Sequence, residues 1–125
     1  MRSKKLHAIA VSLLLLMGLS SARAQAVDGV IQGAQCYLHG QDCVQSKNDP
    51  RLVLENDFIL VSGDKYYFLP NLPRSEKLRA YNDRVRVTGK VTGQKIDVDK
   101  LIRNPGDDER VLWDWDEIAY DLYER

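Results

Sequence analysis

The clearest pattern in this chain is an alternation of apolar and polar residues in its second half. Residues 85–91 place valines on one side and polar or basic side chains on the other, and residues 96–99 repeat the alternation. Gly93-Gln94 lies between the two runs, and glycine at the first central position of a two-residue turn permits the positive φ that hairpins need. The pattern therefore predicts a hairpin. Its predicted register pairs Val91 with Ile96 on the buried side and Lys90 with Asp97 on the exposed side.

Further strands are predicted upstream of this hairpin. Residues 27–38 alternate imperfectly, 52–54 and 58–61 are short apolar runs, and 65–69 form an aromatic, β-rich segment that stops at Pro70. The aromatic segment is expected to be a central strand with rings on both of its faces. Together these segments predict a meander of strands.

Two helices are expected, one between the meander and the hairpin and one in the tail. Residues 72–83 contain Pro73 near their start and good helix formers after it, which is typical of a short helix. Residues 116–123 have helical spacing with acids in the first turn, and Asp114 or Asp116 is expected to cap that helix.

The C-terminal tail allows two interpretations. Ile118, Ala119, Leu122 and Tyr123 form one apolar stripe, which predicts that the helix packs against the sheet while Trp113 and Trp115 fill the gap between them. The alternative is an exposed aromatic surface in which the two tryptophans bind a ligand.

The element order of three strands, a helix and two strands resembles the OB barrel. The segment 85–91 followed by 96–98 is similar to the last two strands of small exported bacterial OB-fold proteins. This resemblance covers residues 27–102 and implies a mainly β fold with short helices, a five-stranded OB-like barrel plus a C-terminal helix. OB barrels host many unrelated functions, so the resemblance implies no particular activity.

The N-terminal residues have the character of a secretory signal peptide. A basic start is followed by the apolar run 6–19 and by the small residues of Ala22-Arg23-Ala24, with a second candidate cleavage site after residue 26. The apolar run is shorter than the roughly twenty residues that a membrane-spanning helix requires, which argues against a retained anchor. We therefore predict a signal peptide over residues 1–24, a single domain over 27–125, and a periplasmic or secreted protein without stable membrane insertion.

Charge narrows the range of partners. The whole chain has 18 basic and 18 acidic side chains, and removal of the predicted leader takes away four basic residues and no acid, which leaves a mildly acidic protein. A nucleic-acid partner is not expected, because the chain lacks the basic stripe that neutralises phosphates. Asp107, Asp108 and Glu109 lack the spacing of a calcium loop and predict a solvated turn.

Cys36 and Cys43 are the only cysteines, and an even count in an exported domain favours a disulfide bond. The alternative is a soft metal site in which His39, with or without Asp42 as a fourth group, joins the two sulfur atoms. A catalytic redox pair is less favoured, because such pairs are usually two residues apart near the start of a helix.

The sequence contains no paired acid and base, activated nucleophile or cofactor motif, so we expect a non-enzymatic protein without a cofactor. The leading hypothesis is an extracytoplasmic interaction module for an unidentified protein or glycan. The alternative hypothesis is a redox-responsive or metal-responsive protein that acts through Cys36, His39 and Cys43. The candidate ligand-binding residues of the leading hypothesis are Lys65, Tyr66, Tyr67, Arg84, Arg86, Trp113 and Trp115.

Overall fold

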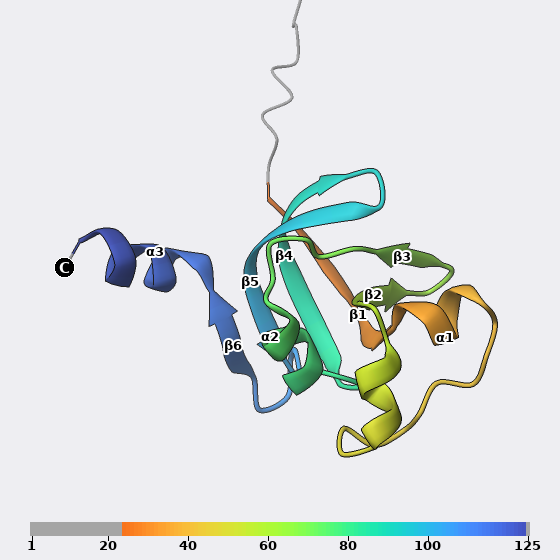
Figure 1. Ribbon diagram of the computed structural model, residues 1–125. Coiled ribbons are helices and arrows are strands. Elements are labelled where there is room, and N and C mark those ends of the chain that lie inside the picture. The colour runs from red at the N-terminus through yellow and green to blue at the C-terminus, as the bar shows by residue number, and fades with distance from the viewer. Residues whose placement is uncertain (1–23, 125) are drawn as a thin grey trace, which may run out of the picture.

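The computed structural model describes residues 24–124. Residues 1–23 of the predicted leader lie outside the described residues. Six antiparallel strands form one sheet in the order β3-β2-β1-β4-β5-β6, accompanied by short helices (Figure 1). The elements are β1 (Gln25–Gly33), α1 (Ala34–Leu38), the 3-10 helix η1 (Pro50–Leu54), β2 (Phe58–Ser62), β3 (Lys65–Tyr67), α2 (Arg74–Arg79), β4 (Arg84–Thr92), β5 (Lys95–Arg103), β6 (Arg110–Asp114) and α3 (Trp115–Tyr123).

The hairpin of β4 and β5 has the predicted register. Val91 lies opposite Ile96 and Lys90 lies opposite Asp97. Gly93 has a φ of 59°, a left-handed conformation that glycine adopts without steric cost and that this turn requires. Local pattern and turn chemistry were therefore sufficient to predict this element.

The hydrophobic core lies on one face of the curved sheet. Ile31 of β1, Leu60 of β2 and Val87 of β4 are fully buried on this face, and α2 with its flanking segments covers it. The chain after α2 is also bonded to the sheet, because Asn82 donates its backbone N–H to the carbonyl oxygen of Ile31 at 2.8 Å. The predicted mainly β class with short helices and a C-terminal helix is thus confirmed.

The sheet departs from the prediction of a closed five-stranded barrel. It has a sixth strand, β6, and it is not closed into a barrel. A single parallel bridge between Phe68 and Lys95 connects the segment after β3 with the start of β5. The predicted central strand 65–69 is instead a three-residue strand at the edge of the sheet.

Two predicted strand segments are helical. The chain leaves β1 at Gly33 and forms α1, so the strand predicted to reach Leu38 ends five residues early. The apolar run 52–54 belongs to η1, whose first turn is capped by the Asp49 side chain accepting a hydrogen bond from the Arg51 backbone N–H at 2.9 Å. Both corrections fall in the connection between β1 and β2.

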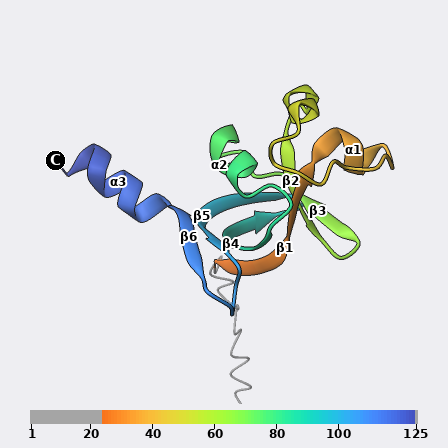
Figure 2. The same ribbon diagram turned by 90° about the horizontal axis from the view of Figure 1, so that it is seen from below.

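The tail packs only in part. Trp113 is buried at 6 % exposure opposite Leu101, but α3 contains no buried residue and extends away from the rest of the molecule (Figures 1 and 2). Of the predicted stripe, Ile118 contacts the core, whereas Leu122 and Tyr123 are exposed. The predicted packing of the whole helix on the sheet is therefore wrong. Among residues 24–124, no helix combines the length and apolar character that a bilayer crossing requires.

Candidate functional site

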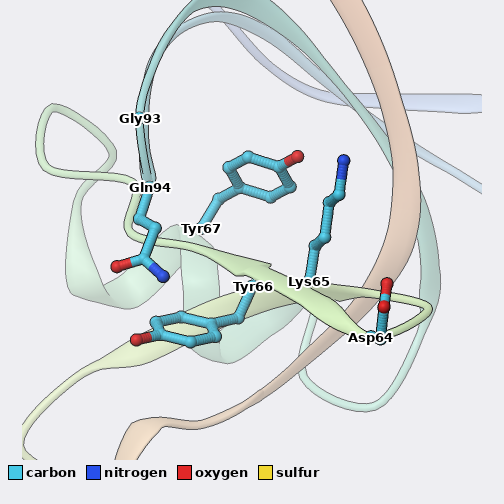
Figure 3. A pocket seen from close by; sticks show the side chains of 6 residues that line it. All are labelled: Asp64, Lys65, Tyr66, Tyr67, Gly93 and Gln94. Carbon is cyan, nitrogen blue, oxygen red and sulfur yellow. The ribbon is translucent and has the colours of Figure 1, made fainter.

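A cavity of about 330 Å³ lies between β3 and the turn that joins β4 to β5 (Figure 3). It lies beside the bridge between Phe68 and Lys95, where the edge strand β3 approaches the start of β5, and we refer to it as the edge pocket. Its lining residues are Asp64, Lys65, Tyr66, Tyr67, Gly93 and Gln94.

Backbone hydrogen bonds at Phe68 join the chain after β3 to the β4–β5 turn beside the edge pocket. The Phe68 N–H donates to the carbonyl oxygen of Gln94 at 2.7 Å, and the Ile96 N–H donates to the carbonyl oxygen of Phe68 at 2.9 Å. Because alternate residues of a strand direct their backbone groups to the same side, the N–H and C=O groups of Tyr66 face the pocket as well. The pocket therefore offers backbone as well as side-chain hydrogen-bonding groups.

The two tyrosines of the edge pocket lie on opposite faces of β3. Tyr67 is paired with Leu60 and packs against the core, and the exposed Lys65 lies on the same face of the strand. Tyr66 is paired with Val61 on the outer face (Figure 3). Gln94 approaches from the turn on the side of Tyr66. A ligand at this edge can therefore meet aromatic surface from both faces of the sheet.

Three of the predicted ligand-binding residues, Lys65, Tyr66 and Tyr67, come together in the edge pocket. Asp64 was not predicted as a ligand-binding residue, and Gly93-Gln94 was predicted only as a turn. The sequence carried no local signal for this contact, because the turn meets β3 only through the bridge between Phe68 and Lys95.

The predicted basic residues Arg84 and Arg86 do not line the edge pocket. They lie on β4, which is separated from β3 by two strands. Arg86 donates a hydrogen bond from Nε to Oδ1 of Asp28 at 2.8 Å, and this hydrogen bond lowers the pKa of the Asp28 carboxyl group. Arg84 donates to the carbonyl oxygen of Pro105 at 3.1 Å.

The two tryptophans differ in their exposure. Trp113 belongs to the core, while Trp115 begins α3 and is 41 % exposed. Their ring centroids are 6.1 Å apart. Trp113 is therefore part of the fold, and only Trp115 offers substantial aromatic surface to a ligand.

Cys36 and Cys43 form a disulfide bond with a Cα–Cα distance of 5.2 Å. Both sulfur atoms are therefore bonded to each other, and neither is a thiolate in this structure. His39 is exposed at the C-terminal end of α1. Within the described part of the chain, no group of three or more His, Cys, Asp and Glu side chains is arranged to hold a metal ion.

Comparison with protein-family models, with curated proteins and with solved structures found no match to this chain. The edge pocket is therefore interpreted from its own chemistry. It combines two phenol rings with one amide, one carboxylate and one ammonium group. Rings of this kind pack on the apolar faces of a ligand, while the polar groups donate and accept hydrogen bonds.

Proposed function

We propose that this protein is a non-enzymatic, extracytoplasmic binding module that holds a glycan in the edge pocket. The observation that carries the proposal is the meeting of Tyr66 and Tyr67 with the polar side chains of two hairpins around one cavity. Sugars present apolar C–H faces and many hydroxyl groups, so they match a lining of rings and small polar groups. The proposal includes the resemblance to small exported OB-fold proteins, which the order of strands and helices along the chain supports. OB-type domains also bind oligosaccharides.

The size of the edge pocket favours a glycan over a protein partner. Its volume of about 330 Å³ lies at the lower end of the range of small-molecule sites. A stable protein interface needs about 800 Å² on each partner. The exposed large apolar side chains that such an interface uses lie elsewhere, in the connection after β1 and in the C-terminal tail.

The proposed location outside the cytoplasm is supported by the disulfide bond between Cys36 and Cys43. Disulfide bonds form and persist in oxidising compartments. The predicted leader and the disulfide bond both support export, and the proposal therefore includes a periplasmic or secreted localisation.

The proposal predicts that the protein binds a neutral oligosaccharide and that Tyr66 supplies a large part of the affinity. Isothermal titration of the purified domain with chitohexaose, cellohexaose and maltohexaose tests it. We expect at least one of the three to bind, and we expect Tyr66→Ala to weaken that binding by about tenfold, equivalent to about 1.4 kcal/mol.

Tyr120→Ala is the matched control, because Tyr120 is 65 % exposed on α3 and lies away from the edge pocket. This variant is expected to bind as the wild type does, and melting curves verify that both variants are folded. Absence of binding to all three hexasaccharides contradicts the proposal. Equal losses in Tyr66→Ala and Tyr120→Ala also contradict it.

A further inference from the structure

Three aromatic rings form a row whose middle member, Tyr66, also lines the edge pocket. The ring of Tyr66 meets the ring of Tyr37 at a centroid distance of 5.9 Å and the ring of Phe68 at 6.0 Å, in each case edge to face. All three side chains are half-buried. Tyr66 therefore belongs both to the edge pocket and to a longer aromatic surface.

The main core cluster does not include this row, although the fully buried Ile59 of β2 lies on the same face of the sheet. Tyr67, the neighbour on the other face of β3, packs against the hydrophobic core. Among the described residues, the core cluster and the partly buried side chains around it do not include Tyr37, Tyr66 or Phe68. The row therefore lies outside the main core, on the face of the sheet that carries Tyr66.

The position of Tyr37 is fixed by contacts of the two residues that precede it in α1. The Glu55 carboxylate accepts hydrogen bonds from the backbone N–H groups of Gln35 at 2.8 Å and Cys36 at 3.2 Å. Gly33 makes this approach possible, because a Cβ atom there would lie 2.4 Å from Cδ of Glu55. The disulfide bond from Cys36 to Cys43 restrains the same helix.

This restraint matters because α1 has only five residues. A helix of that length is not stable by itself in water. Glu55 and the disulfide bond hold it in place, and with it the ring of Tyr37 beside Tyr66. The aromatic row is thus a preorganised surface built from segments that are far apart in the sequence.

We infer that Tyr37 is a further ligand-contacting residue, and that the ligand is an oligosaccharide longer than the edge pocket that continues over Tyr66 onto Tyr37. This inference rests on the proposed function. The step from ring to ring is comparable to the size of one sugar ring, so successive units of a chain can pack on successive aromatic side chains. Short sugars then fill the edge pocket alone, whereas longer ones also gain the contact with Tyr37.

Titration with oligosaccharides of increasing length tests this inference. The probes are the disaccharide, tetrasaccharide and hexasaccharide of a series whose hexasaccharide binds the wild-type protein. We expect Tyr37→Ala to weaken hexasaccharide binding by about fivefold while disaccharide affinity stays within about twofold of the wild type. Tyr37→Leu keeps apolar volume beside Tyr66 without the ring, and it is expected to show the same dependence on length.

The outcomes separate the inference from the proposed function. If Tyr66→Ala weakens every length and neither Tyr37 variant changes hexasaccharide binding, the inference is wrong and the proposed function stands. An equal loss for the disaccharide and the hexasaccharide in Tyr37→Leu means that Tyr37 acts only by supporting Tyr66, which also overturns the inference. If no series binds, the proposed function itself fails.

Discussion

Tyr81 is the largest fully buried side chain, and a single hydrogen bond satisfies its hydroxyl group. The hydroxyl donates to the carbonyl oxygen of Val44 at 2.6 Å, and the ring meets Phe58 edge to face at a centroid distance of 5.7 Å. Burial disfavours the charged phenolate and raises the pKa of Tyr81 above its ordinary value. The free energy of unfolding therefore depends on whether Tyr81 is protonated, and it is expected to change with pH in the alkaline range.

Because the folded-state pKa of Tyr81 is raised, the unfolded chain loses the proton first as pH increases. The contribution of Tyr81 is thus fully present below about pH 10 and decreases as pH rises from there toward the folded-state pKa. We expect Tyr81→Phe to lower the free energy of unfolding at pH 7 by about 0.5–1.5 kcal/mol through loss of the hydrogen bond. Its stability is also expected to decrease less steeply above about pH 10.

Urea unfolding between about pH 7 and pH 11 measures both effects. Tyr120→Phe is the control, because Tyr120 is largely exposed and its replacement is expected to leave the pH dependence unchanged. An unchanged slope in Tyr81→Phe would show that Tyr81 is not the group responsible.

The elements differ in how far local sequence determines them. The register of β4 and β5 next to their turn was predictable, because alternation and Gly93 act within the same twelve or so positions. The bulge between Thr88 and Gly89 and the extension of β5 to Arg103 were not predicted. The 3-10 helix η1 carried a local signal that was missed, since Asp49-Pro50 places a capping side chain directly before a proline. Helix α1 carried none, because its cap is Glu55, which follows it by about twenty residues.

The hairpin register leads to a prediction for two neighbouring positions of β4. Val87 is fully buried between Val27 and Leu101, whereas Arg86 lies on the other face and pairs with Asp28. Val87→Asp places an unpaired carboxylate in the core, which costs several kcal/mol and is expected to unfold the domain. Arg86→Gln removes one exposed ion pair and is expected to cost about 0–1 kcal/mol. Urea denaturation of the two variants measures the difference, and similar midpoints contradict the observed register.

At the scale of the whole molecule, the prediction succeeded for the fold class and failed for closure and for the tail. The pattern identified the strands that form most of the sheet, but the sheet is not closed into a barrel and is extended by β6. The stripe on α3 correctly marked an apolar face. A stripe alone cannot specify what covers that face, and here Leu122 and Tyr123 remain exposed.

The candidate site was predictable only in part for the same reason. Lys65, Tyr66 and Tyr67 are adjacent in the sequence, so one β-rich aromatic segment revealed them together. Gln94 and Tyr37 join them only through long-range contacts, the bridge at Phe68 and the placement of α1. Pairings of this kind depend on the tertiary fold and leave no periodic signal in the chain.

The central claim is that the edge pocket binds an oligosaccharide, and amide chemical-shift mapping tests it most directly. The isotope-labelled domain is titrated with the hexasaccharides named above while the backbone resonances are followed. We predict progressive shifts at Lys65, Tyr66 and Gln94 with none along α3. Shifts concentrated on α3, or spectra that do not change with any of the three sugars, would contradict the account.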